Sequence, residues 1–250
     1  MGFNTIFKSK SQLNLCKQNI NARPYFYPMI PATLHTLIEN QPDAQRAVAW
    51  LREQAAIFEQ KPTNALFYRV VTAMPRFTGK APVVVSEAVK QEMEQLRPGF
   101  QLIYWTLDRL ARVWWLLQYP INDRAAYVKS IGELFRSAEM HELVALYSAL
   151  PVLAFPEEWH FQATEGIRSN IADVQTAIML HNPYPAEQFD EAAWNQMVLK
   201  AFFTDKDVSQ ITGLHARHNS RLTATLRDYV AERRAAGRPV SVQLTELIGY

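Results

Sequence analysis

Apolar side chains recur along this chain at the three- and four-residue spacing of an α-helix, in segments separated by prolines. One segment lies between Pro42 and Pro62, the next begins at Asn64 and ends at Pro75, and a later one is stopped by Pro98. Proline is tolerated at the first turn of a helix and just past its end. Glycine, on which hairpin-rich β folds and phosphate-binding loops depend, contributes only 8 of 250 residues. The pattern therefore predicts an all-α single domain of about ten helices.

Two apolar windows are each predicted to form one helix. Residues 101–119 carry a stripe at helical spacing, and Asp108, Arg109 and Arg112 lie off that stripe. Because these charges interrupt the window, we expect a buried amphipathic helix and no membrane span. Residues 167–178 carry the second stripe, and this helix is expected to end before the next proline, since a residue that precedes proline is pushed out of the α region.

Short polar side chains mark the expected helix starts. They are Ser86, Asn122 or Asp123, Asp190, Asn219 or Ser220, and Ser241. The short connections favour antiparallel neighbours, which can be layered into a helical-repeat-like superhelix or closed into an irregular bundle. No sequence repeat at a fixed period decides between the two architectures. We favour the superhelix.

The first 30 residues differ in charge from the rest of the chain. They hold four basic residues and no acidic one, so they carry +4, whereas residues 31–250 carry −2. We expect residues 1–30 to be a disordered leader or the product of a translation start placed too early, with Met29 as the alternative start. They lack the apolar run of a secretory signal, which points to a cytoplasmic protein. The all-α domain is expected over residues 31–250, and its acidic balance argues against nucleic-acid binding.

Motifs for catalysis or metal binding are sparse. His141 and Glu142 begin like a zinc-protease helix, but Ala145 stands where the second histidine would be. His215 and His218 have no third ligand near them in sequence, and a single cysteine excludes a disulfide or a cysteine-rich metal site. No Gly-x-Ser-x-Gly nucleophile motif is present. The sequence predicts no metal, no cofactor and no catalytic residue, and it favours a protein that is not an enzyme without deciding the question.

A group of polar residues flanks the apolar stripes of the C-terminal third. If the helices of this region pack together, these side chains can converge beside the Asn-Pro-Tyr-Pro sequence at residues 182–185 and form a small binding pocket. The alternative interpretation is that the asparagines satisfy the bent backbone of this turn and that the charged residues pair with neighbours. The candidate binding residues are Arg168, Asn170, Asp173, His181, Tyr184, Asn195 and Lys200.

The stretch from residue 180 to residue 203, LHNPYPAEQFDEAAWNQMVLKAFF, resembles the EboA-domain family. The resemblance continues through residues 226–229 to residues 238–241. It implies a bacterial protein encoded in a gene cluster for the handling or export of secondary metabolites, beside a membrane prenyltransferase-like protein and hydrolase-like and isomerase-like proteins. No catalytic residues are established for the family, so the resemblance assigns none here.

Two functions are compatible with these observations. The one we favour is a non-catalytic accessory or scaffold protein that binds proteins of its own pathway, which processes and exports a secondary metabolite such as a prenylated or terpenoid precursor. The alternative is a small-molecule-binding protein or an enzyme that acts on an apolar metabolite through the pocket near the Asn-Pro-Tyr-Pro turn. Trp105, Trp114, Trp115 and Trp194 motivate this alternative, although aromatic residues at helical spacing usually belong to a core.

Overall fold

The computed structural model describes residues 29–249, which form one all-α domain. The predicted fold class is confirmed, with 13 α-helices and three short 3-10 helices in this part of the chain. The leader predicted over residues 1–30 lies outside the described residues, apart from its last two. The α-helices are α2 (Ile30–Glu39), α3 (Gln45–Gln60), α4 (Asn64–Thr78), α5 (Glu87–Leu96), α6 (Leu107–Leu116), α7 (Arg124–Ser137), α8 (Met140–Ala149), α9 (His160–Arg168), α10 (Ala172–Met179), α11 (Tyr184–Gln188), α12 (Glu191–Phe203), α13 (Ser220–Ala235) and α14 (Val242–Ile248). The 3-10 helices are η1 (Leu150–Val152), η2 (Pro156–Trp159) and η3 (Val208–Gln210).

Side-chain caps define where several helices begin. In each case an Asn, Asp, Ser or Thr oxygen accepts a hydrogen bond from the backbone N–H three residues further on. The predicted starts are confirmed at Ser86, Asp190 and Ser241, and the two open alternatives resolve to Asp123 and Asn219. A cap joins residues only three apart, which is why the sequence alone can place it.

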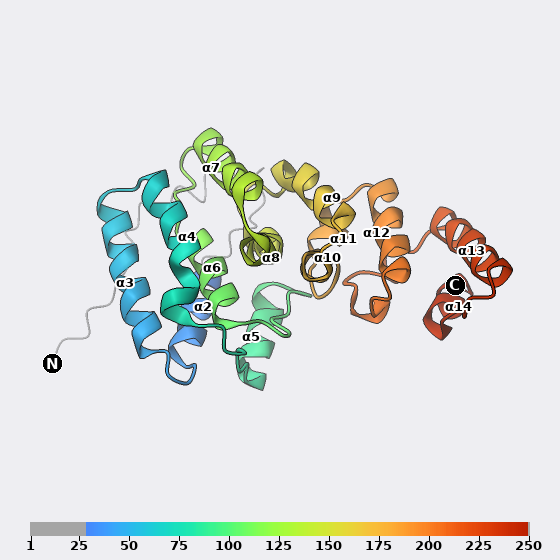
Figure 1. The fold of residues 1–250 in the computed structure, drawn as a ribbon, viewed down its shortest axis with the longest axis horizontal. Coiled ribbons are helices and arrows are strands. Elements are labelled where there is room, and N and C mark those ends of the chain that lie inside the picture. Colours follow the sequence, from blue (N-terminus) through green and yellow to red (C-terminus); the bar gives the residue numbers. More distant parts are fainter. Residues whose placement is uncertain (1–28, 250) are drawn as a thin grey trace.

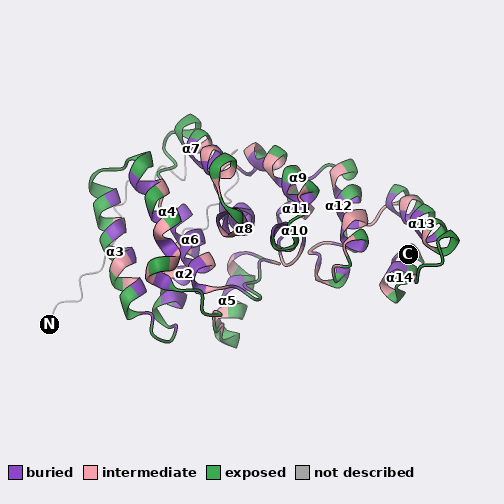
Figure 2. Cartoon of the chain, in the orientation of Figure 1, coloured by how far each residue is buried: buried purple, intermediate pink, exposed green. Residues whose placement is uncertain are grey.

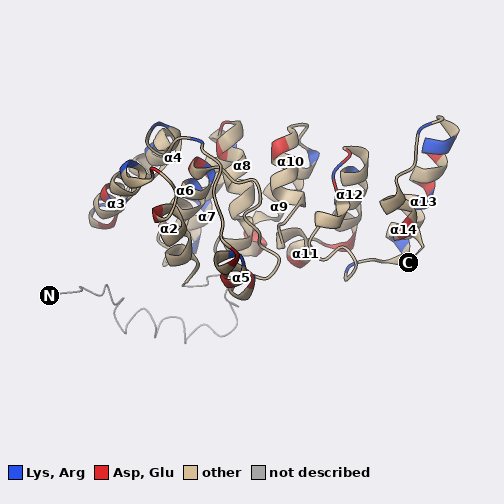
Figure 3. Cartoon of the chain, turned by 90° about the horizontal axis from the view of Figure 1, so that it is seen from below, with Lys and Arg blue, Asp and Glu red and all other residues tan. Residues whose placement is uncertain are grey.

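The helices stand in a row that runs from α3 at one end to α13 and α14 at the other (Figures 1 and 3). Along this row α3 packs on α4, α4 on α6, α6 on α8 and α8 on α10. The row continues through α9 and α12 to α13 and α14. Each helix thus packs mainly on its neighbours, which agrees with the layered helical-repeat arrangement and not with a closed bundle.

Helix α6 lies at the centre of the larger, N-terminal part of the row, where it contacts α2, α4 and α8. Nine of its ten residues are buried, and the inner faces of the surrounding helices are buried as well (Figure 2). The prediction of one helix over residues 101–119 is wrong at its start. The backbone before α6 pairs instead with an earlier loop, through Val83 N to Trp105 O at 2.8 Å and Leu107 N to Ala81 O at 2.9 Å.

Two of the charges of α6 were expected to lie off its apolar stripe, but they are buried in the core. Arg112 Nη1 donates to Asp108 Oδ2 over 2.7 Å, and the Thr106 hydroxyl donates to the other carboxylate oxygen over 2.6 Å. A buried charge is tolerated when it is both paired and hydrogen-bonded. Asp108 and Arg112 therefore form an ion pair inside the core. The spacing of apolar residues alone does not reveal such a pair.

Proline 75 was expected to end its helix, but α4 continues past it to Thr78. Proline has no N–H, so the carbonyl of Val71, four residues earlier, loses its usual helical donor. Arg112 Nε supplies the missing hydrogen bond across the helix interface, 3.1 Å from Val71 O. The packing of α6 against α4 thus lets the helix tolerate an interior proline.

The apolar stripe over residues 167–178 is divided between two helices, so the prediction of one helix is wrong. Helix α9 ends at Arg168 and α10 begins at Ala172. Between them the Ser169 hydroxyl accepts a hydrogen bond from Ile171 N at 3.1 Å, and Gln175 Nε2 donates to Ser169 O at 2.7 Å. Such local side-chain bonds compete with helical ones, and they break the helix at this point.

Candidate functional site

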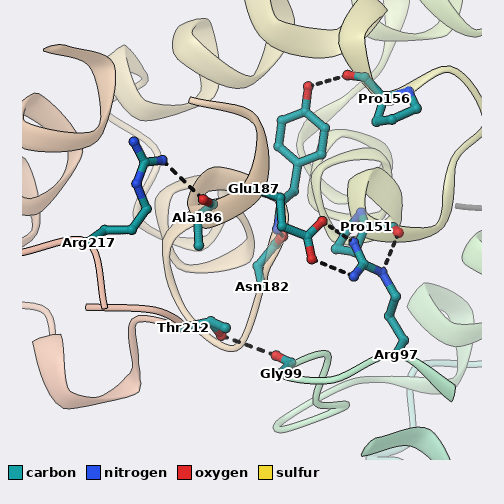
Figure 4. A network of polar contacts seen from close by, with 10 residues as sticks. Arg97, Gly99, Pro151, Pro156, Asn182, Ala186, Glu187, Thr212 and Arg217 are labelled. Atoms are coloured by element: carbon teal, nitrogen blue, oxygen red, sulfur yellow. Dashed lines mark hydrogen bonds and ion pairs between the residues drawn. The ribbon is translucent and has the colours of Figure 1, made fainter. Parts of the chain in front are cut away.

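Helix α11 begins inside the Asn-Pro-Tyr-Pro sequence and is surrounded by polar contacts (Figure 4). The buried side chain of Asn182 shapes its start, because Asn182 Oδ1 accepts a hydrogen bond from Tyr184 N at 3.0 Å. Asn182 Nδ2 donates to Ala177 O at 2.8 Å and to Tyr147 O at 3.1 Å. One asparagine therefore joins α8, α10 and α11. Asn182 is not among the seven candidate binding residues, although an asparagine before a proline is a known turn signal.

An arginine from the end of α5 holds the same short helix. Arg97 Nη1 and Nη2 donate to the two carboxylate oxygens of Glu187, each over 2.6 Å, and Arg97 Nε donates to Pro151 O over 2.8 Å. Paired bonds of this kind between a guanidinium and a carboxylate fix both distance and orientation. Arg97 thereby connects the N-terminal part of the row to α11 (Figure 4).

A second arginine closes the other end of α11. Arg217 Nη1 lies within hydrogen-bond distance of three backbone oxygens, at 3.1 Å from those of Pro185 and Ala186 and 2.8 Å from that of Phe189. Its guanidinium also lies over the ring of Trp194, 4.9 Å from the centroid. A cation at the carbonyl end of a helix is favourable because that end carries partial negative charge. Below, we call Asn182, Glu187, Arg97 and Arg217 the α11 hub.

Three of the predicted site residues are tied into the fold close to this hub. The Tyr184 hydroxyl donates to Pro156 O over 2.7 Å, and Tyr184 is buried. Asn195 is also buried and exchanges side-chain hydrogen bonds of 3.2 and 2.9 Å with Asn219, the cap of α13. His181 is half-buried, and its Nε2 lies 2.9 Å from Gln210 Oε1. Burial lowers the pKa of His181, and its bond to Gln210 opposes that shift.

The other predicted residues lie further out. Arg168, Asn170 and Asp173 are exposed around the turn between α9 and α10, where Arg168 forms an ion pair of 2.6 Å with Glu165. Lys200 is half-buried in the last turn of α12. The structure therefore separates six of the seven candidates into an exposed set and a set near the hub, with Lys200 in neither, and the binding role of all seven stays a prediction. The bent backbone is satisfied by Asn182 and not by Asn170 or Asn195.

No group of three or more His, Cys, Asp or Glu side chains within residues 29–249 is arranged to hold a metal ion. Within the same range, no helix has the length and apolar character needed to cross a membrane.

Two of the four hub residues, Asn182 and Glu187, come from the stretch that carries the family resemblance, and the other two are arginines from other segments. A scan against protein-family models matches residues 30–249 to the family described as metabolite traffic protein EboA. The chain belongs to the EboA family. No curated protein and no solved structure matches it. In this EboA-family chain, Asn182 and Glu187 of the motif use their polar atoms to hold helices together.

Proposed function

We propose that this protein is a non-catalytic accessory scaffold in the traffic of a secondary metabolite, prenylated and terpenoid precursors included, and that it holds a partner protein of the same pathway in the cytoplasm. The family description supports a role in metabolite traffic. The observation that carries the scaffold role is the α11 hub, in which the motif side chains of Glu187 and Asn182 are engaged with Arg97 and with the backbone, respectively. Groups so engaged stabilise a rigid row of helices, and they are not poised for chemistry.

The exposed candidates lie on a surface suited to a partner. On α9, Phe161 and Arg168 are seven residues apart and share one face of the helix. Phe161 is 68% exposed, and Ile171 in the following turn is exposed as well. An exposed aromatic anchor with polar residues at its rim is typical of a protein interface. We call Phe161, Arg168, Asn170, Ile171 and Asp173 the α9 edge and propose it as the partner-binding surface.

Deletion of the gene tests the general role. A scaffold changes where the metabolite accumulates and leaves its chemical structure unchanged, so the deletion strain is expected to retain the finished metabolite in the wrong compartment. Complementation with the wild-type gene is expected to restore its location. Unchanged localisation in the deletion strain would contradict the proposal. Accumulation of a chemically unmodified precursor would instead support the alternative, an enzyme or binding protein acting through a pocket near the Asn-Pro-Tyr-Pro turn.

The partner surface is tested by Phe161→Asp in the complemented strain. We expect this variant to fold normally, because the side chain is exposed, and to lose both co-purification with a pathway protein and the rescue of localisation. Phe203→Asp is the matched control, since Phe203 is also a largely exposed phenylalanine but belongs to α12. Equal behaviour of the two variants would contradict the α9 edge as the binding surface while leaving the traffic role intact.

A further inference from the structure

A hollow of about 260 Å³ lies between α13 and α14. These two helices form the C-terminal end of the row (Figure 1). The hollow includes none of the seven residues selected from the sequence. Its volume exceeds that of an apolar cavity of about 150 Å³ that takes up benzene, so it is enough for a small organic group. The lining residues are Arg227, Val230, Ala231, Arg234, Thr245 and Ile248.

The hollow combines an apolar floor with two cationic side chains. Val230 is buried and Ile248 is half-buried, so both are held in place by the packing of the two helices. Arg227, Ala231 and Arg234 follow at steps of four and three residues, which places them on one face of α13. The two arginines start about 10 Å apart along the helix axis, and their long side chains can reach a common point between them.

Neither arginine side chain of the hollow has a hydrogen bond or ion pair with any residue in the range 29–249. The neighbouring Arg233 behaves differently, because it donates to Tyr229 Oη at 2.9 Å and to Pro239 O at 2.7 Å. The acidic residues of α13, Asp228 and Glu232, lie about 100° or more around the helix from Arg227 and so point away from the hollow. The hollow therefore presents two cations whose charge is not neutralised within it.

Thr245 contributes hydrogen-bond acceptors, but no donor, to the lining of the hollow. Its hydroxyl already donates to Val242 O over 2.7 Å, so the donors that face the hollow come from the two guanidinium groups. Guanidinium groups form strong, charge-assisted hydrogen bonds with phosphate and carboxylate oxygens. The apolar floor is suited to a short hydrocarbon group.

We propose that the α13–α14 hollow binds a small, soluble amphiphilic anion, with a phosphate or carboxylate head between Arg227 and Arg234 and an apolar body on Val230, Ala231 and Ile248. The hollow and the α9 edge share no residue. Binding of a ligand here therefore does not depend on the scaffold role, and either proposal can fail alone.

Titration of the full-length protein with octyl phosphate, below the concentration at which it forms micelles, tests the site by calorimetry. We expect saturable binding, and we expect the double variant R227Q/R234Q to weaken it by at least about tenfold. The matched control is R221Q/R238Q, which removes the same charge from exposed positions outside the hollow. Equal weakening in the two double variants would overturn the proposal, because it would indicate attraction by net charge alone.

Three further experiments separate the head, the body and the source of the ligand. Octyl glucoside has the same chain and no charge, and binding as tight as that of octyl phosphate would overturn the role of the arginines. Ala231→Leu fills the hollow and keeps both arginines, so it is expected to abolish octyl phosphate binding. Vesicles of phosphatidylcholine with phosphatidic acid provide the lipid arm. Flotation with these vesicles, together with no binding of free octyl phosphate, would overturn the proposal of a soluble ligand.

Discussion

The guanidinium of Arg97 contacts both carboxylate oxygens of Glu187 at 2.6 Å, although the two residues are 90 positions apart in the sequence. The Arg97 side chain is only 4% exposed and that of Glu187 is 28% exposed, so the pair is largely removed from water. Substitution of one partner in a buried ion pair is strongly destabilising, because the remaining charge has no partner. The contact therefore fixes the position of α11 relative to α5. Its contribution to the free energy of unfolding can be measured by substitution.

We expect Arg97→Met to lower the free energy of unfolding by about 3 kcal/mol, because it leaves Glu187 and the carbonyl of Pro151 without their donor. Glu187→Gln is expected to be milder. The double variant should lose less than the sum of the two, with a coupling free energy of about 2 kcal/mol in urea denaturation.

The exposed pair Arg168 and Glu165 provides the control for this cycle. Its N–O distance is also 2.6 Å, but both side chains are more than a third exposed. Water and salt screen such a pair, and we expect a coupling free energy of no more than about 0.5 kcal/mol. Similar coupling in the two cycles would contradict the structural role assigned to Arg97.

Asn182→Asp tests the asparagine of the hub with almost no change of shape. The side-chain amide donates to the carbonyls of Tyr147 and Ala177, and a carboxylate in its place would have no proton to donate and would be buried. We expect a loss of about 3 kcal/mol in the free energy of unfolding. Asn170→Asp, on the exposed turn, is the matched control, and its effect should stay within about 0.5 kcal/mol. Thermal melts of the two variants that coincide would count against the role of Asn182.

Glycine 166 is predicted to resist substitution for reasons of space. A Cβ at this position would lie 2.6 Å from Cε1 of Tyr147, a ring that is itself packed against Phe135. Gly166→Ala is therefore expected to lower the free energy of unfolding by about 1–3 kcal/mol. In contrast, a Cβ at Gly132 meets its nearest neighbour at 3.7 Å, so Gly132→Ala should stabilise α7 by about 0.5–1 kcal/mol. The opposite signs can be read from Tm shifts, and a stabilised Gly166→Ala would refute the prediction.

The pH dependence of stability should contain a contribution from His181. Its pKa in the folded chain is lowered from the ordinary value of 6.5, chiefly by burial, while Gln210 and Asp207 act in the opposite direction. Below pH 6.5 the unfolded chain therefore binds a proton more readily than the folded one. The neutral His181 therefore contributes stability to the folded chain above pH 6.5, and this contribution is lost as the pH falls below that value.

His181→Asn removes the titrating group and keeps a residue that tolerates the left-handed backbone at φ 54°. The drop in unfolding free energy between pH 7.5 and pH 5 should be smaller in this variant than in the wild type. His35, whose pKa burial also lowers, remains as a common background in both proteins. An identical drop in the two proteins would show that His181 does not contribute.

The sequence predictions succeeded where one capping side chain decides the local structure, and they failed where hydrogen bonds or an ion pair override the apolar pattern. Asp190 and Ser241 were placed correctly as helix caps, because a cap depends on residues three positions away. The break at Ser169 was missed, because it depends on hydrogen bonds that override a continuous apolar stripe. The burial of Asp108 and Arg112 was missed as well, since their charge is compatible with the core only once they are paired.

The candidate site was harder to predict than the fold. Arg97 and Arg217 contact α11 from segments far away in the sequence, and no local pattern marks either residue. The motif directed attention to Tyr184 and Asn195, which lie near the hub and are engaged there by hydrogen bonds to the backbone and to Asn219. Asn182 could have been selected from its position before a proline, because an asparagine side chain there commonly builds a turn.

The interior proline of α4 has a consequence for how this chain folds. Because Pro75 has no N–H to offer Val71, the helical hydrogen bonds of α4 cannot be completed within its own segment. The bond arrives from Arg112, whose own position depends on Asp108 one turn earlier in α6. The last turns of α4 therefore gain their full complement of hydrogen bonds only when α6 docks. Local helix formation and long-range assembly are one cooperative event at this point of the chain.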